Sequence, residues 1–294
     1  MKSSTMRRTG LAVAVAAALT AASACTPSGS SGASAEKAPP PRRDATQGAA
    51  LAGSLAALRT AERSTDRAET ARVESTTSMG ALMSMTAHGA LGWGDGITGT
   101  LTITYTGGTM ADTMRRLGTT SMEARYLPDA YYARMGEKFA QQADGRHWIR
   151  YAYDDLESLA GGSGALLRDQ MRTTTPNQCV KLLLASGDVR RVGQETVRGE
   201  RTTHYAGTVD VARIADAGLK KQLTQAGVTT QTVDVWVNDR DLLAKKVEKA
   251  RLTTGVLTQT AYYDDYGVKI TTGKPPAGDT QDFRELLHKQ GGTS

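Results

Sequence analysis

A strict period of two between residues 97 and 106 constrains the fold of this chain more than any other feature. Every even position from Thr98 to Thr106 is threonine, and the odd positions from Ile97 to Tyr105 are apolar or glycine. Successive side chains of a β-strand point to opposite faces of a sheet, so this stretch predicts a strand with one buried face and one face in water. Antiparallel sheets commonly have one solvated face, and the chain is therefore predicted to contain an antiparallel sheet.

Other stretches with strand character lie on both sides of residues 97–106. Turns are predicted at Gly94-Asp95-Gly96 and at Leu127-Pro128-Asp129. Leu243–Leu252 is rich in charge and is predicted to be a strand that faces outward. The remaining predicted strands are Ala71–Met79, Met83–Leu91, Thr119–Tyr126, Ala130–Met135, the two halves of Asp188–Asp210, Thr232–Val237 and Val256–Tyr266.

Helical spacing of apolar residues appears at both ends of the strand-rich part and between its halves. Gly48–Arg63 carries one narrow stripe of leucines, and Asp154–Met171 predicts two short helices joined by a loop at Gly161–Gly164. Pro176 suits the first turn of a helix that ends at Leu184. Further helices are predicted at Val211–Ala226 and Asp282–His288, whereas residues 137–153 carry no clear pattern.

The N-terminus has the organisation of an export signal. Lys2, Arg7 and Arg8 precede an apolar run from Leu11 to Ala22, which is of signal-peptide length rather than membrane-spanning length. The sequence Ala22-Ser23-Ala24-Cys25 resembles the cleavage site of bacterial lipoprotein signal peptides, although Ala22 stands where leucine is commonest. The resemblance implies that residues 1–24 are removed and that Cys25 is acylated. An ordinary secretory signal that happens to precede a cysteine is the alternative.

Residues 25–46 are predicted to be a tether. They consist largely of Ser, Gly, Ala and Pro, including three consecutive prolines at Pro39–Pro41, and show no apolar period. Such a composition cannot bury enough apolar surface to fold. We therefore expect an acylated, flexible tether that holds a single domain, residues 47–294, at the extracytoplasmic face of the cell membrane.

Charge and cysteine content limit the function further. Removal of residues 1–24 leaves 33 basic and 30 acidic residues, a net charge of +3, which does not indicate a nucleic-acid-binding protein. The chain has only two cysteines, so acylation of Cys25 leaves no partner for Cys179 within the chain. Three leucines follow Cys179 closely, and we expect this thiol to be buried as a small apolar side chain.

Two motifs carry a resemblance to a known family. "VGQETVRGERTTHYAGTVD" spans Val192–Asp210, and "VDVWVNDRDLLAKKVE" spans Val233–Glu248. These motifs, together with the order of the predicted elements from Gln47 to the C-terminus, resemble the LppX and LprG family of actinobacterial lipoproteins, which share the LolA-like fold. The resemblance implies an α+β fold in which helices cover the concave face of a strongly curved antiparallel half-barrel. It also implies carriage or sensing of a lipid or lipidated glycan, without a cofactor.

Methionine and leucine positions favour an apolar cavity in this fold. Of the ten methionines, eight follow Cys25, and most of these lie in or beside the early strands, whereas phenylalanine occurs only twice. Methionine is flexible and polarizable, so it suits a cavity for acyl chains, although it also fills ordinary cores. The leucines are candidates for a lid with its hinge at Gly161–Gly164. The residues predicted to line the cavity are Leu51, Leu55, Leu58, Met79, Met83, Met85, Leu101, Ile103, Leu156, Leu159, Leu166 and Leu167.

Catalytic and metal-binding patterns are missing from the sequence. His88, His147, His204 and His288 are far apart and have no neighbouring ligand residues at metal-site spacing, and His204 is expected to lie exposed on a strand. We therefore predict a non-catalytic lipid-binding lipoprotein without metal or cofactor, whose membrane transporter partner, if any, the sequence does not identify. The alternatives are a surface-anchored interaction or signalling module with a filled core and, more remotely, a hydrolase that uses Ser163.

Overall fold

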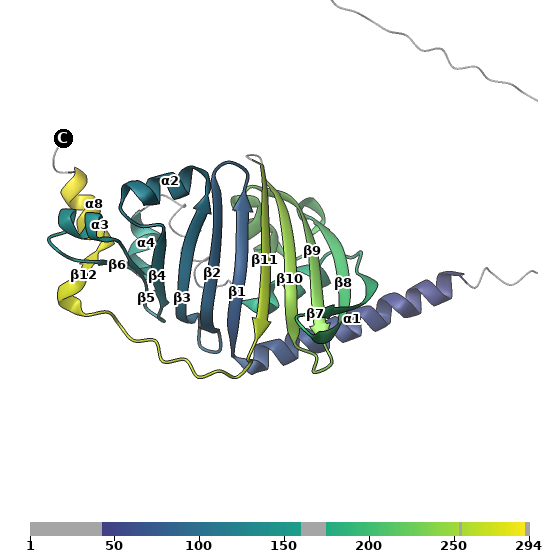
Figure 1. Ribbon diagram of the computed structural model, residues 1–294. Helices are drawn as coiled ribbons and strands as arrows, with labels where there is room; N and C mark the ends of the chain where they lie inside the picture. Colours follow the sequence, from purple (N-terminus) through teal and green to yellow (C-terminus); the bar gives the residue numbers. More distant parts are fainter. Residues whose placement is uncertain (1–42, 160–174, 253–254, 292–294) are drawn as a thin grey trace, which may run out of the picture. The chain divides into compact units, whose positions relative to one another are not determined.

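The computed structural model describes residues 43–159, 175–252 and 255–291, which form one open, curved sheet with helices packed against it (Figure 1). The sheet has twelve strands in these ranges, in the order β12-β6-β5-β4-β3-β2-β1-β11-β10-β9-β8-β7. All neighbouring strands are antiparallel except β12 and β6, which are parallel. The predicted α+β class with a curved antiparallel half-barrel is confirmed.

The strands are mostly about as long as the sequence predicts. Two elements inside the unassigned residues 137–153, a helix and the strand β6, were not predicted, and neither was β12. The strands are β1 (Thr70–Met79), β2 (Met83–Gly92), β3 (Thr98–Gly107), β4 (Ser121–Tyr126), β5 (Ala130–Arg134), β6 (Trp148–Ala152), β7 (Arg190–Val197), β8 (Glu200–Asp210), β9 (Val228–Asn238), β10 (Leu243–Leu252), β11 (Gly255–Asp264) and β12 (Thr280–Asp282).

The helices differ more from the prediction. The helix expected over Val211–Ala226 is broken, because the Asp216 carboxylate accepts a hydrogen bond from the Leu219 amide and so begins a new helix after a short 3₁₀ turn. The first helix begins at Arg43, within the residues predicted to be tether. The helices are α1 (Arg43–Ala68), α2 (Gly108–Arg116), α3 (Glu137–Gln142), α4 (Tyr153–Leu159), α6 (Pro176–Leu184), α7 (Ala217–Gln225) and α8 (Phe283–Gly291), with 3₁₀ turns η1 (Val211–Arg213) and η2 (Ala277–Asp279).

The two largest apolar cores among the described residues lie on the same side of the sheet. The first core joins α1 and α6 to β1 and β8–β11, and Leu58, Leu183 and Val235 are fully buried in it. The second joins β2–β5 to α4 and includes Ala124 and Leu156. The face of the sheet that carries both cores is the apolar face predicted from the alternating strands.

Glycines on β2 and β3 let these two strands approach closely. Gly89 pairs with Leu101, and Gly99 pairs with Leu91. Both glycines have positive φ angles, +154° and +128°, and an added Cβ would lie only 2.1 Å from the Thr100 carbonyl oxygen or 2.2 Å from that of Ala90. Glycine inside a strand is typical of sites where another backbone approaches or the sheet bends.

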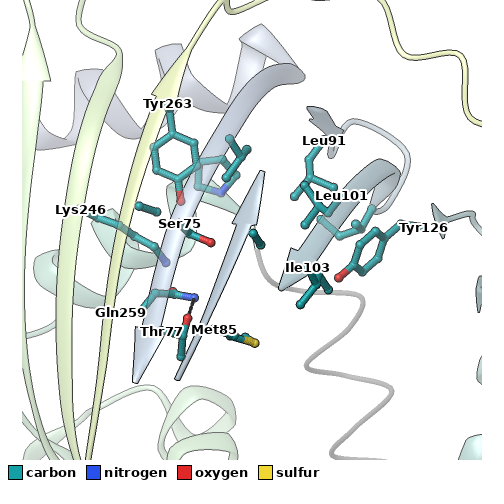
Figure 2. A pocket seen from close by; sticks show the side chains of 15 residues that line it. Ser75, Thr77, Met85, Leu91, Leu101, Ile103, Tyr126, Lys246, Gln259 and Tyr263 are labelled. Carbon is teal, nitrogen blue, oxygen red and sulfur yellow. Dashed lines mark hydrogen bonds between the residues drawn. The ribbon is translucent and has the colours of Figure 1, made fainter. Parts of the chain in front are cut away.

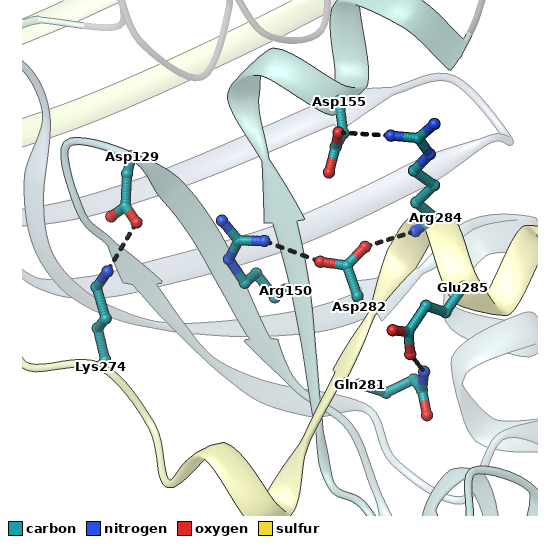
Figure 3. Close-up of polar contacts among 8 residues, drawn as sticks. All are labelled: Asp129, Arg150, Asp155, Lys274, Gln281, Asp282, Arg284 and Glu285. Atoms are coloured by element: carbon teal, nitrogen blue, oxygen red, sulfur yellow. Dashed lines mark hydrogen bonds and ion pairs between the residues drawn. The ribbon is translucent and has the colours of Figure 1, made fainter.

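A C-terminal strap, residues 267–282, connects the interior strand β11 with the edge of the sheet that β12 forms (Figure 1). The strap is held by side-chain contacts along its course, including Lys274 Nζ to Asp129 Oδ2 at 2.8 Å and Arg150 Nη1 to Asp282 Oδ2 at 2.9 Å (Figure 3). Its last residues form β12 and pair with β6. The strap thereby brings α8 against β6, where the Phe283 ring lies 4.7 Å from that of Tyr151.

Within the described ranges, no helix is both long enough and apolar enough to cross a membrane.

Candidate ligand cavity

Two adjoining pockets lie on the face of the sheet that carries the cores. The first pocket has a volume of about 320 Å³ and is lined by β1–β4, β10 and β11, with Pro176 of α6 at its margin. The second has a volume of about 310 Å³ and lies between the sheet and the helices α6 and α7. Because both pockets are lined by Thr77, Met85, Lys246 and Gln259, we treat them together as the cavity.

The first pocket lies where the two cores meet. Val73, Ala261 and Tyr263 line it and belong to or border the first core, whereas Leu101 and Ile103 line it and belong to the second. The described side chains of the two cores thus leave space where the cores meet. Small side chains on the floor, Ala87 and Ala261, deepen that space.

The wall of the cavity is apolar because the alternation of the strands places every second side chain there. Figure 2 shows Leu91, Leu101, Ile103 and Tyr126 on one side of the first pocket. The tyrosine is partly buried, and desolvation raises its hydroxyl pKa above the ordinary value. An uncharged, water-poor wall of this kind suits apolar chains.

The centre of the cavity, in contrast, is polar. Lys246 and Glu248 of β10 form an ion pair with 2.5 Å between Nζ and Oε2, and their side chains are only 6% and 15% exposed. The Gln231 side chain donates a hydrogen bond of 2.9 Å to the other Glu248 oxygen. Gln259 Nε2 lies 3.4 Å from the Thr77 hydroxyl (Figure 2).

Burial and pairing act in opposite directions on Lys246. Burial has the largest single effect and lowers the pKa of the ammonium group, but Glu248, Tyr263 and Cys179 together raise this pKa by more, so that the net direction is upward. Lys246 therefore carries its charge inside the cavity. This charge and the Glu248 carboxylate stabilise each other against the cost of burial.

The prediction that Leu243–Leu252 faces outward is wrong for one face of this strand. Lys246 and Glu248 lie on that face and point into the cavity. These two share their face with the buried Ala244 and Ala250, whereas Lys249 lies on the exposed face. The alanines at alternate positions, Ala244 and Ala250, indicated in the sequence that this face of the strand is buried. Charged residues usually lie in water, but the mutual pairing of Lys246 and Glu248 allows both to be buried here.

Cys179 lies in the second pocket, as a buried free thiol of α6. Its Sγ donates a hydrogen bond of 3.1 Å to the Pro176 carbonyl oxygen, and burial raises the pKa of the thiol to about 12. Thiols with a raised pKa are poor nucleophiles because little thiolate forms near neutral pH. The predicted role as a small buried apolar side chain is confirmed.

The predicted strand residues lie near one another, but not all of them line the cavity. Met85, Leu101 and Ile103 line the first pocket, and Met83 and Met85 line the second. Met79 pairs with Met83 and is partly buried, yet it lines neither pocket. Sequence reasoning did not identify Tyr126, Tyr263, Gln259 or Lys246 as lining residues.

The predicted lid residues of α1 and α4 lie elsewhere. Leu58 is completely buried in the first core, Leu55 packs against that core and Leu51 is 38% exposed. Leu156 is buried in the second core. None of these four lines either pocket, since α1 packs mainly along α6 and α4 packs on β6.

Some predicted sites cannot be placed. Leu166, Leu167, the Gly161–Gly164 loop with Ser163, and Cys25 lie outside the described residues, as does the side chain of Leu159.

The structure places His204 among carboxylates. His204 is buried, in contrast to the prediction, because it stacks at 4.1 Å on the Trp236 ring and lies between the Glu195 and Asp234 carboxylates. Over the ranges that the structure describes, no group of three or more His, Cys, Asp and Glu side chains could hold a metal ion.

Comparison with solved structures finds lipoproteins of mycobacteria. LppX of Mycobacterium tuberculosis is 14% identical with a TM-score of 0.47, over 75% of this chain and 98% of LppX. LprF of Mycobacterium bovis is 13% identical with a TM-score of 0.47, over 76% of this chain and 98% of LprF.

The fold and the cavity define an α+β protein of the open half-barrel class, with its pockets between sheet and helices. No protein-family model matches the chain. The Streptomyces coelicolor protein named "Putative lipoprotein SCO4650" is 59% identical over 300 residues, which cover 99% of this chain and 100% of that protein. The chain belongs to the same family as this protein. A Streptomyces griseus protein named "Uncharacterized 31.2 kDa protein in rplA-rplJ intergenic region" is 52% identical over 254 residues, 83% of each chain.

Proposed function

We propose that this chain is an exported lipoprotein that binds a lipid or lipidated molecule in the cavity, without catalysing a reaction. The observation that carries the proposal is the pair of adjoining pockets, about 320 and 310 Å³, with largely apolar walls. Drug-sized ligand pockets have volumes of about 300–1,000 Å³. A filled core, which an interaction module would have, does not account for this space.

Transfer of acyl chains out of water supplies the free energy of binding. Burial of apolar surface contributes about 25 cal/mol per Å², so one long chain contributes on the order of 10 kcal/mol before the entropic cost of ordering. Flexible walls such as Met83 and Met85 adapt to chains of different shape. Neither a cofactor nor a catalytic group takes part in such binding.

Anchoring through Cys25 completes the proposal. The lipobox-like sequence before Cys25 and the name of the Streptomyces coelicolor relative both support a lipoprotein. Residues 25–46 then connect an acylated Cys25 on the extracytoplasmic face of the cell membrane to the folded domain, where a lipid or lipidated glycan is within reach. A membrane transporter that delivers or receives the ligand is a further candidate partner.

A cavity-filling variant tests the binding function. Ala87 of β2 lines the first pocket, and Ala90 lies on the opposite face of the same strand. Lipids are extracted from purified protein with organic solvent and quantified by mass spectrometry. We expect Ala87→Phe to reduce the bound lipid several-fold, whereas Ala90→Phe leaves it unchanged. If the original chain contains no lipid and takes up none from vesicles, the proposed binding function is wrong.

Metabolic labelling with radioactive palmitate tests the anchor. The original chain is expected to be labelled and to sediment with membranes, whereas Cys25→Ala is expected to lose both properties. Cys179→Ala removes the other cysteine and serves as the matched control. Label retained in the Cys25→Ala variant would contradict acylation at this residue.

A further inference from the structure

The ion pair at the centre of the cavity has more hydrogen-bonding capacity than its described surroundings use. Lys246 Nζ carries three N–H donors, and among the described residues it donates one hydrogen bond, to Glu248. Each Glu248 oxygen accepts one hydrogen bond, one from Lys246 and the other from Gln231. Two N–H donors of Lys246 are therefore unused among the described residues.

The register of the sheet gathers further donors around Lys246. Lys246 lies beside Ala261 in the sheet, and Ala261 lies beside Ser75. Neighbouring strands are about 4.8 Å apart, so the ammonium group and the Ser75 hydroxyl flank the small side chain of Ala261. The Thr77 hydroxyl accepts from Gln259 and keeps its own hydrogen for another acceptor. Figure 2 shows Lys246, Ser75, Thr77 and Gln259 around the same part of the first pocket.

Apolar space extends from this polar centre in two directions. The first pocket continues to Leu101, Ile103 and Tyr126, and the second continues beneath α6 and α7 to Leu182 and Leu223. Lys246 lines both pockets. An amphiphilic ligand whose head group lies at Lys246 can therefore place acyl chains in either pocket or in both.

A structural role alone does not account for the pair. Buried ion pairs are weak sources of stability, because desolvation of the two charges offsets most of their attraction. Apolar side chains of similar size would fill the space equally well. A charged pair at a junction of two apolar pockets is better explained by a ligand that uses it.

We propose that Lys246, held in place by Glu248 and Gln231, binds the anionic head group of an acyl-bearing ligand. The carboxylate of a fatty acid and the phosphate of an acidic lipid share the required chemistry, an oxygen that is negatively charged and accepts several hydrogen bonds. Ser75 and Thr77 donate further hydrogen bonds to the same head group. This inference rests on the proposed lipid-binding function and adds the chemical class of the ligand.

The test compares probes that differ only in the head group. Dissociation constants are measured with the full chain for palmitate against hexadecanol, and for dipalmitoyl phosphatidate against dipalmitoylglycerol. We expect each acidic probe to bind about tenfold more tightly than its neutral partner, which corresponds to one charge-assisted hydrogen bond of about 1.4 kcal/mol. A preference seen only for palmitate over hexadecanol identifies a carboxylate as the head group. A preference seen only for phosphatidate over diacylglycerol identifies a phosphate.

The double variant Lys246→Met/Glu248→Gln removes both charges together, so that no uncompensated charge remains buried. We expect it to bind neutral and acidic probes about equally, whereas Lys246→Arg retains the preference. Lys249→Met removes one charge from the exposed face of the same strand and is expected to leave the preference unchanged. Thermal unfolding of each variant verifies that it is folded.

The outcomes separate this inference from the function on which it rests. Equal binding of acidic and neutral probes by the original chain overturns the head-group assignment and leaves lipid binding intact. Preference for the acidic probes that persists in the folded double variant also overturns it. Failure of the original chain to bind any of the four probes overturns lipid binding and the assignment together.

Discussion

At the scale of single residues, Lys246 and Glu248 are the most unusual feature of this protein. Two charged side chains lie side by side within a largely apolar cavity, and each depends on the other for compensation of its charge. Loss of one partner leaves a buried charge, whereas loss of both leaves only a neutral polar surface. The two partners are therefore expected to behave non-additively.

Unfolding in urea checks this coupling. We expect Lys246→Met alone to lower the free energy of unfolding by about 3 kcal/mol, because Glu248 then lacks its cation. The double variant Lys246→Met/Glu248→Gln is expected to lose less than the single variant. A single variant with unchanged stability would show that the ion pair contributes nothing in the folded state.

A second feature at the residue scale is the contact between the C-terminal strap and His147, which directly precedes β6. His147 lies beside Asp279, with 2.7 Å between Nδ1 and Oδ1, and beside Glu137, with 3.1 Å between Nε2 and Oε1. Hydrogen bonding to Asp279 and then to Glu137 raises the pKa of His147 above its ordinary value. The same contact with His147 lowers the pKa of Asp279.

The raised pKa of His147 and the lowered pKa of Asp279 together determine how the stability of this contact depends on pH. The raised His147 pKa contributes stability that is full below about pH 6.5 and is lost as the pH rises through the folded value. The lowered Asp279 pKa contributes stability that is full above about pH 4 and is lost as the pH falls through the folded value. We expect hydrogen-exchange protection of β12 to be greatest between these limits. His147→Gln should flatten the profile above pH 6, and an unaltered profile in that variant would contradict this assignment.

At the scale of elements, the close approach of β2 and β3 depends on two glycines. Gly89 and Gly99 lie opposite Leu101 and Leu91, which line the first pocket. A Cβ at either glycine would collide with backbone of the neighbouring strand rather than with a flexible side chain. These glycines therefore fix the position of part of the cavity wall.

Substitution of Gly89 by alanine tests this dependence. The new Cβ would lie 2.1 Å from the Thr100 carbonyl oxygen, so one strand has to move, and the positive φ angle adds strain. We expect a loss of at least about 2 kcal/mol in the free energy of unfolding. Gly193→Ala in β7, where nothing lies within 4 Å of the added Cβ, is the matched control. Equal stability of the two variants would refute the close-packing argument.

Elements with strong local patterns were predictable from the sequence. The alternation around Leu101 and Ile103 predicted β3 and its buried face, and Pro176–Leu184 has the predicted bounds. In contrast, the three residues of β12 are too few to show a period, and their pairing with β6 depends on residues about 130 positions apart. Local sequence carries no information about such a pairing.

The cavity could be predicted only in part, for a related reason. Met85, Leu101 and Ile103 were identified because their apolar side chains alternate along one strand face. Lys246 was missed because its burial depends on Glu248 and on Gln231 of another strand, and the sequence alone does not show that pairing. The leucines of α1 were misplaced because helical spacing predicts a buried stripe without identifying its partner.

At the scale of the whole domain, two separate cores share a single sheet. The core of β8–β11 is covered by α1 and α6, whereas the core of β2–β5 is completed by α4 and by Phe283 of α8. The C-terminal strap thus connects β11 to α8, whose Phe283 packs on the second core.

Removal of residues 268–294 tests the division into two cores. We expect the truncated chain to lose hydrogen-exchange protection in β4, β5 and β6, because β6 loses its pairing with β12 and Tyr151 loses its contact with Phe283. Protection in β8, β9 and β10 is expected to change little. Uniform loss of protection in all strands would show instead that the sheet unfolds as one cooperative unit.

The two edges of the sheet differ in a way that affects how copies of this chain meet. β12 covers one edge with only three residues and offers a short surface for backbone pairing. The other edge, β7, begins with Arg190 and Arg191 and has an irregular register before Gly193. Short, charged or irregular edges resist strand-by-strand addition of a second molecule. Even at high local density, neighbouring copies are therefore kept from fusing their sheets into fibrils.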